Sequence, residues 1–433
     1  MSSRLKYVVV MTSTCLVAML MAGAVVGRSA SPEDAYRHLA VYTEVLSRIK
    51  SDYVEEPDMK SVTLGAVNGL LEAIDPYASF LSAEQYKTYL KAKDTAKGGV
   101  GLILSKRFGY IGIVDAIPGS PADKAGLSTG DMIETVTGVS TRDMPLAYAE
   151  VLLNGAPGTT VELAVLRLRR SSEAQKVTLT RAEVKYPPVA ARMLEPGIGQ
   201  IEVASLEAGK TKQVAEAIAS LEKQGAKKLV LDLRHAAYGA PQEGAALANL
   251  FLDKGLITYL QGQKVSRQNF EADPAKAVYR DPLVVLTNRG TAGGAEVAAA
   301  ALADSKRATL VGERTYGDAA LRRAITMDDG SAVILSVAKY YSPSGKAIQD
   351  NAVTPGVPVL DSEPAAEIDE DAPGKPETPE PPRKLEDDAA LKKAIEVLTK
   401  GVPPAEERKT QAQGPDSRTL SPRGPLGQPR LPR

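Results

Sequence analysis

A regular alternation of two kinds of segment between residues 190 and 358 constrains the fold of this chain more than any other feature. Short apolar runs rich in β-branched residues alternate there with amphipathic or alanine-rich stretches. Such an alternation predicts an α/β fold, in which helices cover a sheet. The predicted strands are 199–203, 228–233, 282–287, 308–311 and 332–338, and the predicted helices are 211–224 and 296–303.

The N-terminus carries a long uncharged run. Arg4 and Lys6 precede residues 7–27, which are rich in Val, Met, Leu and Ala. A basic start followed by an apolar run is typical of a secretory signal, and about 20 apolar residues also suffice for one membrane span. We therefore expect a signal peptide or membrane anchor at residues 1–30 and a periplasmic or otherwise exported protein. Only residues 7–27 would contact the membrane, and cleavage of the signal is left open.

Residues 31–96 predict a helical segment, with a second amphipathic helix at 58–74. Apolar residues in the first helix recur at spacings of three and four, which places them in one stripe. We expect this stripe to pack against the same chain. The alternative is a self-association seam, which would make the protein a homo-oligomer. The stripe consists of Leu39, Tyr42, Leu46, Ile49 and Tyr53.

The C-terminal part is set apart by proline. Of the 29 prolines, 15 follow residue 354. Proline-rich, charged segments bury too little apolar surface to offset the entropy of ordering. We therefore expect an acidic linker at 359–385 and a disordered tail at 402–433. Between them, residues 386–401 predict one docking helix. Its apolar face consists of Leu391, Ile395 and Leu398.

The charge balance and the scarcity of two residue types exclude several classes of function. The chain has 53 Lys and Arg against 53 Asp and Glu, so its formal net charge is zero. Nucleic-acid binders normally carry a basic surplus. The chain has only two histidines, His38 and His235, and one cysteine, Cys15, which are too few for the usual zinc sites. We expect no nucleic-acid partner, no metal and no cofactor.

Residues 97–170 have a different texture, with short β-branched runs separated by Gly, Pro and Asp turns. The phrase GSPADKAGLSTGDMIETVTG at 119–138 contains one helical turn, a left-handed stop at Gly126 and a turn at Gly130. Together with the later NGAPGTTVEL, this phrase resembles the PDZ domain found in bacterial proteases. The resemblance implies a small β-rich α+β domain.

In that family, a peptide's terminal carboxylate is held where this chain has Gly99-Val100-Gly101-Leu102. Glycines expose backbone N–H groups there, successive donors form an anion nest, and an edge strand accepts the peptide. The alternative is a β-module that binds nothing. The implied peptide-binding residues are Gly99, Val100, Gly101, Leu102, Leu104, Leu146 and Leu152, the last two from a helix expected at 144–153.

The order of these segments, from about residue 36 to 398, resembles the carboxyl-terminal processing (tail-specific) peptidases. The resemblance implies an α/β peptidase core with ClpP/crotonase-like layers, an inserted PDZ domain at 97–170 and the N-terminal helical segment. The core is expected at 171–358. The phrases that carry the resemblance are YVEEPDMKSVTLGAVNGLLEAIDPYASFL at 53–81, LVLDLR at 229–234, LTNRGTAGGAEVAAAALADSKRATLVGERTYG at 286–317 and YYSPSGKAIQDNAVTPGVPV at 340–359.

The resemblance also implies where catalytic residues should stand. The family uses a serine nucleophile, a neutral lysine base, a glutamine that orients the lysine, and backbone N–H groups that hold the oxyanion. The family's Gly-(Ser/Thr)-Ala-Ser-Ala-Ser-Glu phrase reads GTAGGAE here, so Gly293 takes the place of the serine. Asp318 takes the place of the lysine, and Arg322 that of the glutamine. The family's oxyanion turn, Asp-Leu-Arg-Asn-Asn-Pro-Gly-Gly, reads DLRHAAYG, with Tyr238 in place of one glycine before Gly239.

These exchanges remove the expected chemistry. Glycine has no side-chain oxygen to acylate, aspartate is ionised at neutral pH, and arginine keeps its proton. We expect Asp318 and Arg322 to pair with each other. No catalytic residue is therefore predicted to be intact, and we interpret the chain as a pseudoprotease. It would bind protein C-termini or unfolded, extended peptides as an adaptor or regulator, with an active peptidase relative as a further candidate partner.

Other groups are candidates for a replacement catalytic site. Thr291 precedes the serine position by two residues and is expected to face elsewhere. Ser342 and Lys346 are expected in a solvated turn, where a lysine keeps its charge. His235 could pair with Thr291 or Tyr238, but a lone histidine is more often a surface or packing residue. An active peptidase with unconventional catalytic residues is thus the first alternative function, and an envelope scaffold is the second.

Overall fold

The structure is a computed structural model that describes residues 32–95, 97–107, 109–142, 144–167, 173–349, 351–360 and 388–402. The expected signal or anchor, most of the acidic linker and nearly all of the proline-rich tail lie outside the described residues. The chain divides into two compact units, Met1–Val67 and Asn68–Arg433, each of which is described by itself. No helix within the described ranges is both long enough and apolar enough to cross a membrane.

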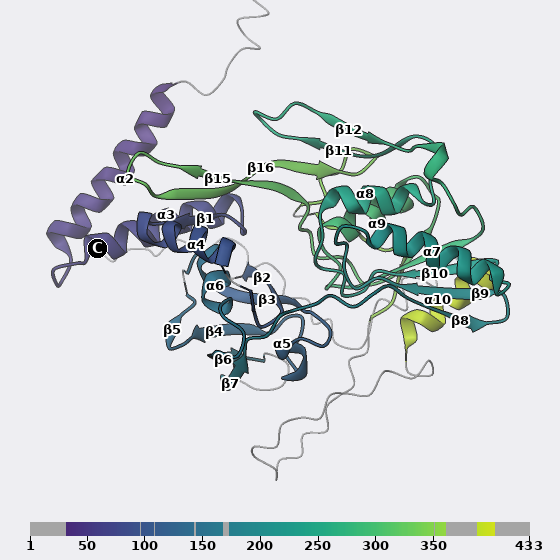
Figure 1. The fold of residues 1–433 in the computed structure, drawn as a ribbon. Coiled ribbons are helices and arrows are strands. Elements are labelled where there is room, and N and C mark those ends of the chain that lie inside the picture. Colours follow the sequence, from purple (N-terminus) through teal and green to yellow (C-terminus); the bar gives the residue numbers. More distant parts are fainter. Residues whose placement is uncertain are drawn as a thin grey trace, which may run out of the picture. The chain divides into compact units, whose positions relative to one another are not determined.

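The described part of the first unit is helical, as predicted. It contains α2, Pro32–Asp52, and the first turns of α3, Met59–Ile74, which Asp58 caps with its carboxylate (Figure 1). The predicted apolar stripe is only partly covered. Leu39 is 58% exposed and Tyr53 is 61% exposed, whereas Tyr42, Leu46 and Ile49 are partly buried. Packing of the whole stripe against the same chain stays a prediction.

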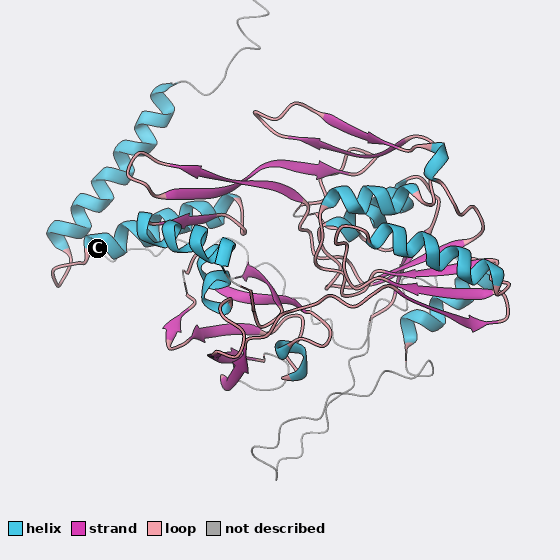
Figure 2. Ribbon diagram, in the orientation of Figure 1, coloured by secondary structure: helices cyan, strands magenta, loops and turns pink. Residues whose placement is uncertain are grey.

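The second unit contains a small domain built on one antiparallel sheet. Its strands, which Figure 2 draws in magenta and Figure 1 labels, follow the order β2-β3-β4-β6-β7, and β5 pairs with β4. Apolar side chains from these strands and from α6 form one buried cluster. Ser120 caps α5 by accepting the Asp123 N–H at 3.2 Å. The strands are β2 Leu102–Arg107, β3 Tyr110–Ala116, β4 Met132–Val136, β5 Val139–Ser140, β6 Thr160–Leu166 and β7 Gln175–Thr180, and the helices are α5 Pro121–Lys124 and α6 Leu146–Leu153.

This domain continues past residue 170, where the sequence predicted its end. Strand β7 pairs with β6 along its whole length, from Gln175 to Thr180. Beyond it, Ala182 bridges to Gly99, so that the two ends of the domain meet. The QKVTLT strand is polar and mostly exposed. It therefore carries little of the apolar signal by which a strand is found in a sequence.

The predicted α/β core is a six-stranded sheet in the order β17-β14-β13-β10-β9-β8, in which only the β8–β9 pair is antiparallel. Helices cover both faces. Leu229 and Leu231 pack with α7, α8 and α9, whereas Val230 and Val284 pack with α10. The strands are β8 Ala190–Glu195, β9 Ile198–Glu202, β10 Lys228–Asp232, β13 Leu283–Thr287, β14 Thr309–Gly312 and β17 Val357–Pro358, and the helices are α7 Lys210–Lys223, α8 Pro241–Asn249, α9 Gly294–Asp304 and α10 Ala389–Lys400.

A second sheet of the core follows the order β1-β16-β11-β12, with β15 on the other edge of β16. It recruits β1 from the N-terminal segment, where Ser79 pairs with Ile334. The sequence predicted only helix there, because a strand of three residues has no detectable periodicity. The remaining elements are β1 Ser79–Leu81, α4 Ala83–Thr95, β11 Leu256–Gln261, β12 Gln268–Glu271, the 3₁₀ helix Pro274–Lys276, β15 Ala320–Thr326 and β16 Ala332–Tyr341.

Candidate functional site

Gly293, in the expected nucleophile position, lies at the N-terminus of α9. Its φ of +59° is in the region that glycine adopts most readily. A Cβ added to this residue would lie 3.5 Å from the backbone oxygens of both Asp318 and Gly239. A side chain at position 293 would thus point between the turn after β10, residues 233–239, and the segment before β15, residues 313–319. The fold brings these three segments together, although they are far apart in the sequence.

Asp318 and Arg322 form the ion pair that the sequence predicts. The Arg322 guanidinium also lies over the Tyr77 ring, 4.1 Å from its centroid, which is a cation–π contact. Burial lowers the pKa of Arg322, but the charge and hydrogen bond of Asp318 outweigh burial and raise it. The guanidinium therefore stays charged, and the pair supplies no neutral amine that could act as a base.

Glu296, three residues after Gly293, is a buried carboxylate that joins α9 to the segment before β15. It accepts the N–H groups of Gly293 at 3.1 Å, Gly317 at 2.7 Å and Asp318 at 2.7 Å, and also the hydroxyl of Thr315. Burial raises the pKa of Glu296 to about 7, against the effect of these hydrogen bonds. All of its bonds are to the scaffold, so this residue holds the site together.

The hydroxyls near the site are engaged in structural contacts. Thr291 is fully buried, donates to the Leu233 carbonyl at 2.8 Å and accepts the Asn288 N–H at 3.0 Å. Ser342 shares a hydrogen bond of 3.0 Å with Ser344. Lys346, in the same turn, is exposed, so its amine is not buried beside the Ser342 and Ser344 hydroxyls. Neither place has the arrangement of an activated nucleophile.

The basic groups that are shielded from water also have structural partners. Lys106 lies 3.4 Å from Glu72, Lys210 donates to the Pro187 carbonyl, and Lys228 donates to the Leu398 carbonyl at 3.0 Å. Within the described ranges, none of these three amines is hydrogen-bonded to a hydroxyl, and no group of His, Cys, Asp and Glu side chains is arranged to hold a metal ion. In this part of the chain, none of the three is therefore placed to activate a replacement hydroxyl.

His235 contacts two residues other than those the sequence suggested. Its Nδ1 lies 3.0 Å from the Asp115 carboxylate and its Nε2 lies 2.9 Å from the Asn288 amide nitrogen. Partial burial lowers the pKa of His235, whose side chain is 49% exposed, but the hydrogen bond and charge of Asp115 outweigh this effect and raise the pKa. Asp115 belongs to the small β-domain. No local pattern could have predicted the contact, because 120 positions separate the two residues in the sequence.

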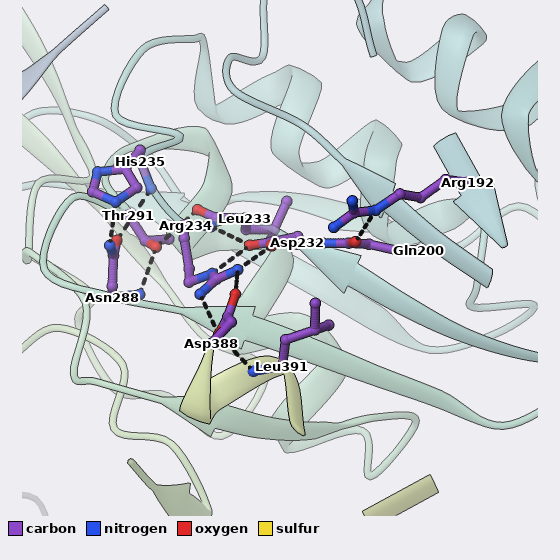
Figure 3. Close-up of polar contacts among 10 residues, drawn as sticks. All are labelled: Arg192, Gln200, Asp232, Leu233, Arg234, His235, Asn288, Thr291, Asp388 and Leu391. Carbon is purple, nitrogen blue, oxygen red and sulfur yellow. Dashed lines mark hydrogen bonds and ion pairs between the residues drawn. The ribbon is translucent and has the colours of Figure 1, made fainter. Parts of the chain in front are cut away.

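An ionic network, which the sequence analysis missed, supports the turn after β10 (Figure 3). Arg234 donates to Asp232 at 2.7 and 2.9 Å and to Asp388 at 2.8 and 3.0 Å. Asp388 also caps α10 by accepting the Leu391 N–H at 2.8 Å. The network therefore ties α10 to the strand that carries the turn. The LVLDLR phrase could have predicted part of this network, since Asp232 and Arg234 are two charged residues at the end of an otherwise apolar strand.

The Gly99–Leu102 loop of the small domain has the features of an anion nest. Gly101 has φ +80°, and a Cβ there would lie 2.2 Å from Cβ of Ser120, so only glycine fits. The Gly99 N–H donates to the Ala182 carbonyl at 2.9 Å. The N–H groups of Val100 and Gly101 have no acceptor among the described residues. Two of the expected donors are thus available to a ligand, and Gly99 is not one of them.

The strand that follows this loop has a free edge. β2 is the terminal strand of its sheet and pairs only with β3. The apolar residues predicted to line the groove belong to β2, α6 and the loop before β2, and all of them join the buried cluster of the domain. Val100, Leu104 and Leu146 are buried, whereas Leu102 and Leu152 are partly exposed.

The known proteins that this chain resembles agree with the architecture. Residues 197–359 match the model of peptidase family S41, and residues 112–167 match that of a PDZ domain. The chain therefore has an S41 peptidase fold with a PDZ domain and an N-terminal helical segment, as the predicted fold class stated. A solved photosystem II D1 C-terminal processing protease has a TM-score of 0.61 and 28% identity, covering 74% of this chain and 92% of that chain.

Sequence relatives narrow the assignment. The carboxy-terminal processing protease CtpA of Bacillus subtilis is 35% identical over 313 residues, which cover 72% of this chain and 66% of that protein. The carboxyl-terminal-processing protease of Synechocystis sp. is 34% identical over 315 residues, which cover 71% of this chain and 73% of that protein. The chain belongs to the carboxyl-terminal processing protease family. It spans slightly less than two thirds of the Bacillus relative.

Proposed function

We propose that this chain is an exported pseudoprotease, a family member that binds protein C-termini or extended peptides through its PDZ domain without cleaving them. The observation that carries the proposal is the composition of the site around position 293. Gly293 points no side chain towards the turn after β10, and a charged Asp318–Arg322 pair stands where the family has lysine and glutamine. Glycine carries no nucleophile and the charged pair supplies no neutral amine base, which supports the proposal.

The binding half of the proposal is supported by the PDZ domain. The Val100 and Gly101 N–H groups can donate to a terminal carboxylate, and the free edge of β2 can pair with the main chain of the same peptide. The partly exposed Leu102 and Leu152 favour an apolar side chain near the peptide's C-terminus. The relatives' names describe those proteins as proteases. We propose that this chain shares with them the recognition of C-termini but not the cleavage.

Export rests on the sequence alone. The basic start and the uncharged run at residues 7–27 favour a secreted or periplasmic protein, with that run as a signal or an anchor. Such a location would place the PDZ domain among exported proteins and envelope proteins. The proposed role there is that of an adaptor, or of a regulator that presents or withholds C-termini.

Peptide binding tests the proposal directly. A fluorescent peptide with an apolar C-terminal residue is titrated with the full chain, once with a free carboxylate and once with an amidated end. We expect at least tenfold weaker binding for the amide, since it lacks the charged carboxylate to which the loop N–H groups donate. Leu102→Asp should weaken binding by a similar factor, because it places a carboxylate in the groove. Val139→Asp, at an exposed apolar position of β5, is the matched control and should bind normally.

Two results would contradict the binding proposal. The first is equal affinity for the free acid and the amide, which would remove the carboxylate nest from the account. The second is equal affinity of the Leu102→Asp and Val139→Asp variants for the free acid, which would place the peptide elsewhere. In both cases, circular dichroism of each variant establishes that the PDZ domain is folded.

A further inference from the structure

The turn after β10 makes two contacts outside the α/β sheet. The first is the 3.0 Å hydrogen bond from His235 to Asp115, a residue of β3 in the PDZ domain. The second is a stack of Tyr238 on Tyr186, with ring centroids 4.6 Å apart and planes 16° from parallel. Tyr186 belongs to the segment that leads from the PDZ domain to the core. One short turn therefore contacts both the PDZ domain and its connection to the core.

The core holds His235 in the orientation that this contact needs. Its φ is +60°, which is uncommon for a residue other than glycine. The Asn288 side-chain oxygen accepts the N–H groups of His235 at 3.1 Å and Gly290 at 3.0 Å, so the Asn288 nitrogen must face the ring. That nitrogen donates to Nε2 of the neutral ring at 2.9 Å, which places the ring proton on Nδ1. Nδ1 thus donates to Asp115 whether the ring is neutral or charged.

Asp115 depends on this bond. Its side chain is almost fully buried, and its Oδ2 has no hydrogen-bond partner among the described residues. The other contact of Oδ1, from the Thr129 hydroxyl, is long at 3.5 Å. A buried carboxylate that loses its main donor is costly. The other charged groups that act on this contact are Asp123 near Asp115, and Asp232, Arg234 and Glu202 near His235.

We infer that the turn after β10 is a docking site for the chain's own PDZ domain, and that Asp115 and His235 form the clasp that holds the domain on the core. In the family, the same turn supplies the oxyanion hole. Here a histidine takes the place of the first asparagine of the family's turn, and Tyr238 takes the place of a glycine. In this chain, the turn contacts the PDZ domain and its connection to the core.

The clasp also orients the peptide-binding edge, a consequence that rests on the proposed function. Asp115 pairs with Ile103 of β2, the strand that would accept a peptide. Holding Asp115 on the core fixes the direction in which that strand faces. The docking itself does not require a peptide, so it is tested without one.

The test measures the distance between the two domains by pulsed electron spin resonance. Spin labels are placed at Lys176→Cys on β7 and Lys212→Cys on α7, both exposed, in a Cys15→Ser background. The unaltered clasp should give one narrow distance distribution. His235→Asn restores the family's residue and suits the left-handed backbone. It should raise the undocked fraction about tenfold or more, because the bond to a charged group is lost.

Asp115→Ala tests the other side of the clasp and should raise the undocked fraction by a similar factor. The double variant should be no worse than either single one, because both remove the same contact. Glu162→Gln is the matched control, since it neutralises a PDZ carboxylate whose partner, Lys176, lies in the same domain. Because Lys176 must stay unaltered in this control, the spin label is placed at the exposed Gln175 instead. Distributions of His235→Asn and Asp115→Ala that equal the control would overturn the inference, and so would additive effects in the double variant. Because no peptide is present, failure here leaves the peptide-binding proposal standing.

Discussion

Gly101 and Gly293 are both glycines in left-handed backbone, and they have opposite meanings for function. At Gly101, the backbone carries the function, since a bare main chain exposes N–H groups and lets Ser120 approach closely. At Gly293, the family's function lies in a side chain, and glycine removes it. The loss at Gly293 therefore leaves the PDZ site intact. A glycine is informative only when it is known whether the backbone or the side chain does the chemistry.

The two regions also differ in what surrounds them. In the loop at Gly101, the N–H groups of Val100 and Gly101 have no acceptor among the described residues. Around Gly293, by contrast, the N–H groups of residues 293, 317 and 318 all donate to Glu296. In the proposed function, the second region keeps its scaffold without the family's reactive groups. If the region around Gly293 is purely structural, substitutions there change the stability of the fold.

The largest effect is expected from Glu296→Ala. The variant leaves the Gly293, Gly317 and Asp318 N–H groups without their acceptor in a buried place. We expect a loss of about 3–5 kcal/mol in the free energy of unfolding, measured by denaturant titration. Glu271→Ala, at an exposed position of β12, is the control and should cost less than about 0.5 kcal/mol. Equal stability of the two variants would show that the Glu296 bonds do not hold the site.

A smaller effect is expected from Arg322→Ala. It leaves Asp318 without its cation and removes the contact with the Tyr77 ring. Because both charged side chains are partly exposed, we expect a loss of about 1–2 kcal/mol, less than that of a fully buried pair. Thermal unfolding followed by circular dichroism measures it, with Arg280→Ala at an exposed pair as the control. A melting temperature equal to that of the unaltered chain would count against a stabilising role for the pair.

The sequence predicted elements well where apolar periodicity is strong. β10 begins at Lys228 as expected and ends one residue early, at Asp232, and α7 lies within one residue of its predicted bounds. It failed for β1 and β7, because one is too short to show a period and the other is too polar. Strands of these kinds are fixed by their partners in the sheet.

For the site, the sequence predicted which residues take the positions of the family's catalytic residues, but it did not predict the contact between the PDZ domain and the core. Gly293, Asp318 and Arg322 were found because motif spacing is local, and the Asp318–Arg322 pair was found because its members are four residues apart. The clasp between Asp115 and His235 was missed, because only the packing of two domains brings these residues together. Physical pairing over such a span leaves no trace in a single sequence.

A pseudoprotease of this family binds C-termini and does not cleave them. The most direct measurement incubates the purified chain with an unstructured protein that has an apolar C-terminus and follows its intact mass over time. We predict no time-dependent loss of mass from the substrate, for the unaltered chain and for Gly293→Ala alike. Cleavage that grows with time and persists in Gly293→Ala would contradict the account and point to a nucleophile elsewhere in the chain.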